Sequence, residues 1–379
     1  MQNSSRGRVD PFIVMDVLDA ARRAEAAGRD IVHMEIGQPG TPAPAAARAA
    51  VAAALEHDTL GYTVALGLPE LRQRIARLYR DWYGLTIDPA RIVVTSGASG
   101  AFLLALTALF DAGDRVGLGV PCYPSYRQIL SALSLRPVGI DTDPSTRFLP
   151  TPAALPADLA GLILASPGNP TGTVATRPEL AALIAAAGER GLAVISDEIY
   201  HGLSYGQPAV SALELSDDLF VINSFSKYFS MTGWRVGWMV VPQSHVRTIE
   251  RLAQNMFICA PHVSQIAALA ALDAEAECRA NIAAYAQNRA ILLDGLARAG
   301  LNDLAPPDGA FFIYADVSSM TDDALAFADR ILAQAGVAVT PGLDFDPVRG
   351  GRFLRFSYAA ATGDIRRGTE RLVEFFRKG

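Results

Sequence analysis

Apolar residues recur along this chain with two different spacings, which predict helices and strands. Between residues 69 and 82, Leu71, Ile75, Leu78 and Trp82 recur every three or four positions, which predicts an amphipathic helix. Short, almost wholly apolar runs instead predict strands that are buried on both faces. Such runs are found at 91–97, 114–120, 135–141, 161–167, 192–198 and 220–225.

Helical segments such as 98–110 and 125–133 separate several of these runs. Alternating strands and helices predict an α/β fold with a mostly parallel central sheet sandwiched by helices. After about residue 245 the pattern changes to long Ala-rich helices and more widely spaced strands, which predicts a smaller α+β domain. The helical stretch is 262–298, and the strand-like segments are 309–317, 336–342 and 353–359. We therefore expect a large domain at 46–275, a small domain formed by 11–45 with 276–379, and an N-terminal arm at 1–10.

Composition excludes several classes of protein. The chain has 379 residues, is 50% hydrophobic and carries a formal net charge of −6, which argues against nucleic acid or an anionic membrane as partner. The longest apolar stretch, 101–110, falls well short of the roughly 20 residues that span a bilayer. Neither the three cysteines nor the five histidines show metal-ligand spacing, so we expect no metal. The cysteine content and the lack of a signal-peptide pattern favour a cytoplasmic location.

Lysine is scarce in this chain. Lys and Arg total 33, but Lys227 and Lys378 are the only lysines. Arginine cannot form a Schiff base, because its guanidinium stays protonated. Lys378 lies next to the C-terminus, so Lys227 is the better candidate for amine chemistry.

Three segments near Lys227 or after a predicted strand are suited to an anion. The segment TSGASG (95–100) ends a strand and opens a helix, whose first N–H groups can bind phosphate. In SFSK (224–227) two hydroxyls precede Lys227, and in TGWRVG (232–237) Arg235 offers a two-point contact. Taken singly, each could be an ordinary turn or a surface ion pair. Together they predict a phosphate cup beside an amine.

The stretch SFSKYFSMTGWRVGW resembles the lysine signature of class I/II aminotransferases, the fold type I family of pyridoxal-5′-phosphate (PLP) enzymes. The resemblance extends over residues 36–358. It is carried, in order, by IGQPGTPAP, GYTVALGLPELRQRIA, TSGASGA, PCYPSY, SPGNPTG, SDEIY, GAFF and FLRFSYA. It implies the PLP-dependent transferase fold type I, with PLP as cofactor.

The resemblance assigns roles toward the cofactor. It implies that Lys227 is the Schiff-base residue and that Asp197 faces the pyridine nitrogen, whereas a helix cap is the ordinary interpretation of such an aspartate. The remaining cofactor-binding residues it implies are Gly97, Ala98 and Ser99 (backbone, phosphate), Ser224, Ser226 and Arg235 (phosphate), Tyr123 (ring face), and Asn169 and Tyr200 (ring hydroxyl). Turn chemistry at Asn169 and core packing at Tyr123 are the alternatives, and the peptide bonds before Pro167 and Pro170 could be cis.

The resemblance also implies a substrate end. Arg355 would bind the substrate α-carboxylate, with Arg352 as the competing candidate, and the Gly37 backbone and Asn169 would lie beside it. Tyr62 would reach the cofactor phosphate of a second subunit, so the resemblance implies a homodimer with composite sites. An arginine for a distal carboxylate stays unidentified, and Arg8 and Arg22 remain open.

The implied activity is transfer of an amino group between an amino acid and a 2-oxo acid by a ping-pong mechanism. Lys227, Asp197 and Tyr200 would be the catalytic residues, with Lys227 moving the α-proton. Another fold type I PLP reaction, catalysed by a β-lyase, synthase or decarboxylase, would need the same cofactor-binding residues. A regulator with an aminotransferase-like domain would need a DNA-binding module, and no basic N-terminal module is expected here.

Overall fold

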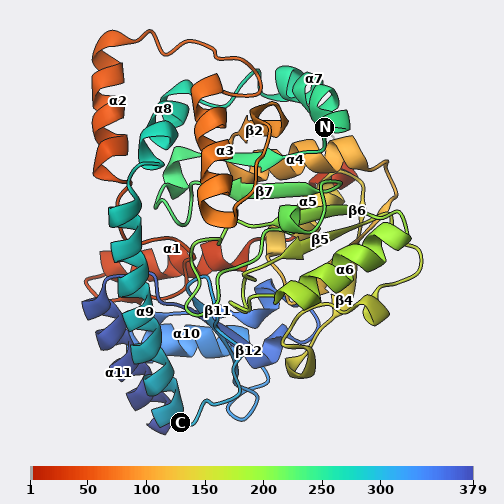
Figure 1. Ribbon diagram of the computed structural model, residues 1–379. Coiled ribbons are helices and arrows are strands. Elements are labelled where there is room, and N and C mark those ends of the chain that lie inside the picture. Colours follow the sequence, from red (N-terminus) through yellow and green to blue (C-terminus); the bar gives the residue numbers. More distant parts are fainter. Residues whose placement is uncertain (1–2, 379) are drawn as a thin grey trace.

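The computed structural model describes residues 3–378, so the first two residues of the predicted N-terminal arm lie outside the described part. Figure 1 shows a large sheet with helices on both sides and, below it, a smaller group of strands and helices that includes the C-terminus. The predicted α/β architecture, with a central sheet sandwiched by helices and a smaller α+β part, is confirmed.

The large sheet has seven strands. Their order is β2 (Ile92–Thr95), β8 (Gly237–Val240), β7 (Phe220–Ser224), β6 (Ala193–Asp197), β5 (Gly161–Ala165), β3 (Arg115–Val120) and β4 (Arg136–Asp141). Strands β7, β6, β5, β3 and β4 are parallel, whereas β8 runs antiparallel to both β2 and β7. The mostly parallel sheet was predicted, and the reversed strand β8 was not.

Alternate residues of these strands point into two separate cores, as expected for strands buried on both faces. On one face Val93, Ile163, Ile195, Ile222 and Met239 pack with helices α4 (Gly97–Leu109), α5 (Pro124–Ala132) and α7 (Val246–Met256). On the other face Ile92, Leu162, Val194, Val221 and Val240 pack with α3 (Pro69–Tyr83), α6 (Arg177–Glu189) and α8 (His262–Ala271). The predicted helices at 69–82, 98–110 and 125–133 are confirmed to within one residue at either end.

The smaller part contains two sheets. One is antiparallel, in the order β11 (Thr340–Pro341), β12 (Phe353–Ser357) and β9 (Phe312–Asp316). The other pairs β1 (Val32–His33) with β10 (Val337–Ala338). The predicted strand at 336–342 is therefore two short strands, because the chain passes from one sheet to the other at Val339.

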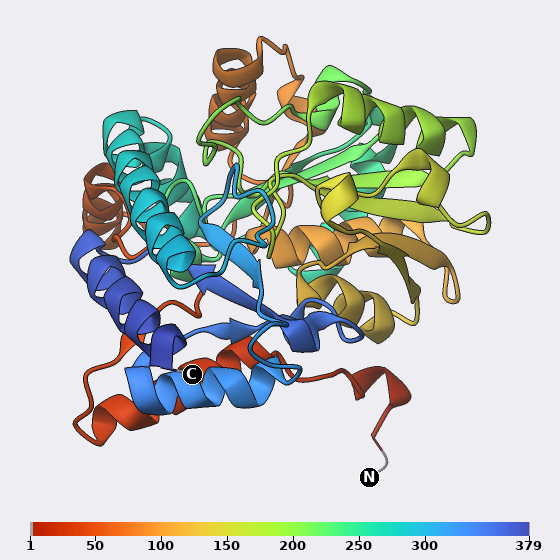
Figure 2. The ribbon, with the colours of Figure 1, turned by 90° about the horizontal axis from the view of Figure 1, so that it is seen from below.

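Helices cover these small sheets. They are α1 (Ile13–Ala26), α10 (Ala324–Ala335) and α11 (Thr362–Lys378), and Figure 2 shows them grouped on the side away from the large sheet. The predicted helical stretch 262–298 is two helices, since the chain breaks between α8 and α9 (Glu275–Arg298). The remaining long helix, α2 (Ala45–His57), packs on α8. None of the helices in residues 3–378 is long and apolar enough to cross a membrane.

Candidate active site

A cavity of about 630 Å³ lies where the large sheet meets the smaller part. Asp197 ends β6, and the loops that follow β3 and β5 also reach the cavity, which agrees with the rule that ligands bind at the carboxyl ends of parallel strands. Most of the residues predicted from the sequence line it, namely Gly37, Ala98, Ser99, Tyr123, Asn169, Asp197, Tyr200, Ser226, Lys227, Arg235 and Arg355. Gly97, Ser224 and Tyr62 do not.

The Lys227 side chain enters the cavity from the segment that follows β7. Its Nζ donates a hydrogen bond to the Gly37 carbonyl oxygen at 2.6 Å and lies 5.7 Å from the centre of the Tyr200 ring. Burial, together with the positive charges of Arg355 and Arg235, lowers the pKa of the Lys227 amine to about 8. An amine with such a pKa is partly uncharged near neutral pH, so it can act as a nucleophile and as a base.

Asp197 is buried at the end of β6, with 4% of its surface exposed. The Tyr126 hydroxyl donates a hydrogen bond to one carboxylate oxygen, and the Ile199 N–H donates to the other at 3.1 Å. Burial raises the pKa of Asp197 to about 6, against the opposing effect of these donors. Tyr126 was missed in the sequence. The signal was the second tyrosine of PCYPSY, three residues after Tyr123 and on the first turn of α5.

The opposite wall carries the groups suited to phosphate. The first turn of α4 contributes Ala98 and Ser99, and Ser226 and Arg235 line the same cavity, with the Arg235 guanidinium next to Gly97 at the start of α4. Gly97 has a φ of +71°, which favours glycine, and a Cβ added there would lie 2.5 Å from Arg235 Nη2 and displace the guanidinium. Guanidinium, hydroxyl and helix N-terminal N–H groups together form the donor set that a phosphate dianion needs. The residues present therefore fit the cofactor phosphate.

Ser224 lies behind this wall. Its hydroxyl donates a hydrogen bond to the Val236 carbonyl oxygen at 3.2 Å and shares a second hydrogen bond with the Ser226 hydroxyl, with the two oxygens 2.8 Å apart. The sequence predicted that both hydroxyls would face one anion, but only Ser226 lines the cavity. The Ser224 hydroxyl orients that of Ser226.

Arg355 lies on β12 at the other end of the cavity and is 2% exposed. Its Nη1 donates to Asn169 Oδ1 at 2.9 Å and its Nη2 to the Glu35 carbonyl oxygen. The guanidinium lies between the rings of Phe312 and Phe345, at 4.4 and 4.7 Å from their centres. Among the described residues no carboxylate pairs with it, and its Nε has no hydrogen-bond partner. Burial lowers the pKa of Arg355 to about 10, still high enough to keep its charge.

A buried, charged guanidinium without an acidic partner is costly, and a bound carboxylate would remove that cost. Arg352, the competing candidate, has a side chain that is 60% exposed and lies 4.0 Å from Asp316, so it is not in the cavity. The geometry therefore favours Arg355 for the substrate carboxylate.

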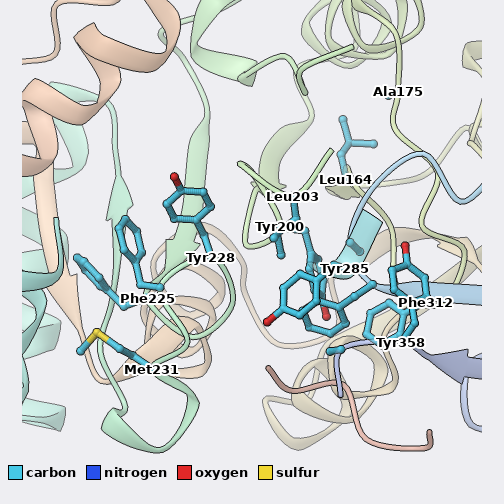
Figure 3. Packing of buried hydrophobic residues seen from close by; sticks show 14 of the residues in the cluster. Leu164, Ala175, Tyr200, Leu203, Phe225, Tyr228, Met231, Tyr285, Phe312 and Tyr358 are labelled. Carbon is cyan, nitrogen blue, oxygen red and sulfur yellow. The ribbon is translucent and has the colours of Figure 1, made fainter. Parts of the chain in front are cut away.

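Aromatic side chains shape the middle of the cavity. Tyr200 packs edge-on against Phe312, with ring centres 5.7 Å apart. Figure 3 labels both among the buried residues of one hydrophobic cluster. Tyr123 packs edge-on against Tyr126 and Phe12.

Both prolines near Asn169 follow cis peptide bonds. Tyr62 is 82% exposed and lies outside this cavity, and no group of residues in the described chain could hold a metal ion.

Comparison with known proteins identifies the family to which this constellation belongs. Residues 29–372 match the model of aminotransferase class I and II. The chain is a member of that family. It is 50% identical over 374 residues to a valine–pyruvate aminotransferase of Mycobacterium tuberculosis, covering 97% of this chain and 96% of the relative. It is 35% identical, over 97% of this chain and 98% of the relative, to a (5-formylfuran-3-yl)methyl phosphate transaminase of Methanocaldococcus jannaschii.

Solved structures agree. A crystal structure of an aminotransferase from Mycobacterium tuberculosis superposes with a TM-score of 0.98 at 48% identity, over the full length of both chains. The protein is thus a pyridoxal-phosphate-dependent aminotransferase that moves an amino group between an amino acid and a 2-oxo acid. When bound, the cofactor supplies an electron sink next to the substrate α-carbon. Names of the relatives favour transamination over the other PLP reactions that the sequence left open.

Proposed function

We propose that the preferred amino donor has an uncharged aliphatic side chain, such as valine or alanine, and that pyruvate is an acceptor. The observation that carries this proposal is the apolar end of the cavity, formed by Phe12, Val14, Met15, Ile36 and Ile129. The arginines among the described residues that line the cavity are Arg235 and Arg355, both with other tasks, and neither Arg8 nor Arg22 lines it. A donor with a distal carboxylate would therefore find no further positive charge among the described residues that line the cavity.

The proposed roles follow from the contacts. Lys227 holds the cofactor and moves the α-proton, because its amine is buried and has a lowered pKa. Asp197, supported by Tyr126, faces the pyridine nitrogen, and Asn169 and Tyr200 face the ring hydroxyl. Ala98, Ser99, Ser226 and Arg235 bind the phosphate, with Gly97 and Ser224 shaping their positions. Gly37 and Arg355 hold the substrate carboxylate.

The proposed assembly is a homodimer in the cytoplasm. The 82% exposure of the Tyr62 side chain supports a contact with a second copy, where it would reach that copy's phosphate. Cys122, Cys259 and Cys278 are all free thiols, which supports a reducing compartment. Residues 46–275 contain the whole seven-stranded sheet, which supports the proposed division into large and small domains.

A donor screen tests the proposal. The holoenzyme is mixed with valine, alanine or aspartate, and the loss of the visible absorbance of the bound cofactor is followed in single turnovers. Valine and alanine are expected to react at least tenfold faster than aspartate. Met15→Arg, which adds a guanidinium to the apolar end, should move the preference toward aspartate. Aspartate reacting as fast as valine with the unmodified enzyme would refute the aliphatic assignment.

A further inference from the structure

The N-terminal segment forms part of the cavity wall. Phe12, Val14 and Met15 line the cavity, and the Phe12 ring packs edge-on against Tyr123 at 5.9 Å between centres. Figure 2 shows this segment, in red, running along the outside of the molecule into α1. The wall therefore depends on what fixes the first turn of α1 in place.

A remote carboxylate holds that turn. Phe12 is the N-cap residue of α1 and supplies no side-chain hydrogen bond. Instead, Asp344 accepts a hydrogen bond from the Ile13 N–H on one carboxylate oxygen and from the Val14 N–H on the other, both at 3.1 Å. Asp344 is 3% exposed, and a negative charge is favourable at a helix N-terminus. It thus replaces the missing local cap from more than 300 residues away in the sequence.

The same loop also touches the substrate arginine. Arg127, on α5, donates hydrogen bonds to the carbonyl oxygens of Asp344 at 2.8 Å and Phe345 at 2.9 Å. The Phe345 ring lies 4.7 Å from the Arg355 guanidinium. Residues 344–345 therefore join three elements: the N-terminal wall, α5 and the arginine of β12.

We propose that Asp344 is a positioning residue that holds Phe12, Val14 and Met15 at a fixed distance from Arg355, and so sets the space open to the donor side chain. Arg355 would bind the α-carboxylate of the donor and the N-terminal wall would limit the length of its side chain. Residues 344–345 would fix the distance between these two contacts. The choice of donors below rests on the proposed function, whereas the proposal about Asp344 has a test that needs no donor.

The first test is limited trypsin digestion of the holoenzyme without substrate, with the fragments identified by mass spectrometry. Cleavage after Arg22 and Arg23, inside α1, requires that helix to leave its place. Asp344→Ala should raise the rate of this cleavage about five- to thirtyfold, as expected for the loss of a helix cap. Asp344→Asn keeps one acceptor oxygen and should restore most of the protection, since asparagine caps about as well as aspartate. The matched control is Asp346→Asn, a buried aspartate of the same loop that contacts Val348 and Arg349 but not α1.

The second test compares steady-state constants for two donors. Asp344→Ala should raise KM for valine several-fold more than KM for alanine, whose methyl side chain is shorter, while kcat changes less and the cofactor absorbance stays unchanged. Unchanged cleavage after Arg22 and Arg23 in Asp344→Ala, or equal acceleration in Asp346→Asn, would overturn the proposal. An equal rise of KM for both donors would do so as well. Failure of the unmodified enzyme to use valine would instead count against the proposed donor class.

Discussion

The Lys227 amine donates a hydrogen bond to the carbonyl oxygen of Gly37 across a separation of 190 residues in the sequence. Lys227 lies just after β7 of the large sheet, whereas Gly37 lies just after β1, which belongs to the smaller part of the molecule. A Cβ added at Gly37 would lie 2.8 Å from the buried Phe312 ring, so a larger residue could not keep this backbone position without moving that ring. The reactive amine is therefore positioned only when both parts of the molecule are folded together.

Lys227→Ala is expected to abolish the visible absorbance of the bound cofactor and nearly all transamination, because no other amine lines the cavity in the described chain. Absorption spectra and an amino-transfer assay measure both effects. The control is Lys378→Ala, which removes an exposed lysine paired with Glu374 and should leave both unchanged. Normal turnover in the Lys227 variant would remove this residue from the mechanism.

Arg355→Lys should reduce kcat/KM about tenfold to a few hundredfold for every amino donor while the cofactor stays bound. Lysine keeps the charge but loses the planar two-point contact, and hydrogen bonds to charged groups contribute about 1.5–3 kcal/mol each. The exposed Arg352, substituted in the same way, should have kinetics close to those of the unmodified enzyme. A loss confined to acidic donors would show that Arg355 binds a distal carboxylate instead.

Tyr62→Phe should weaken cofactor retention about tenfold or more while the proposed dimer stays assembled, since it would delete the proposed hydrogen bond to a charged phosphate. Dialysis followed by spectroscopy gives the retained cofactor, and analytical ultracentrifugation gives the assembly state. If the dimer kept its cofactor as firmly as before, Tyr62 would have no part in the site. A fully active monomer would contradict the composite site itself.

The cofactor-free protein should become more stable as pH rises from about 8 to 10.5. Burial lowers the pKa of Lys227 from 10.5 to about 8, so the folded state loses this proton at a lower pH than the unfolded chain. The cost of burying the charged amine is therefore present in full below pH 8 and is removed above pH 10.5. Cofactor-free Lys227→Met should exceed the unmodified protein in stability at pH 7 by about 1–3 kcal/mol, because the variant has no charged amine to bury.

Urea unfolding at pH 7 and pH 9.5 would measure that difference. It should shrink at the higher pH, where the unmodified protein has already released the proton on folding. A variant that is less stable than the unmodified protein at both pH values would show that the lost hydrogen bond to Gly37 outweighs the cost of the buried charge.

Local patterns were sufficient for most of the fold. The helix around Leu71 and Ile75 and the strand that ends at Asp197 follow from spacing alone. The helix buries one face, which gives a repeat of three or four residues, and the strand buries both faces, which gives a continuous apolar run. The reversal of β8 could not be predicted in this way. Its residues alternate as those of a parallel strand do, and its direction depends on the short connection that begins after Ser224 and contains Lys227 and Arg235.

Motifs in the sequence were sufficient to predict cavity-lining positions such as Lys227 and Arg355, whose roles in the reaction stay predictions. Those that act through tertiary contacts were not. Asp344 caps a helix that begins far away in the chain. The rings of Phe312 and Phe345 both contact the Arg355 guanidinium, which requires that β12 pair with β9. The spacing of residues along the sequence predicts neither contact, because each depends on how separate elements pack.

The cofactor-binding and substrate-binding groups lie on different sheets, the seven-stranded and the three-stranded one, and this affects how the substrate range of such an enzyme can evolve. Groups suited to the cofactor lie on the loops of the seven-stranded sheet, whereas Arg355 and the loop that fixes the N-terminal wall belong to the three-stranded one. Substitutions in the smaller sheet can therefore resize or recharge the pocket without touching the lysine or the phosphate cup. Libraries aimed at new donors are best concentrated at positions 12–15 and 344–345, which lie on other segments than Lys227 and the phosphate-binding residues.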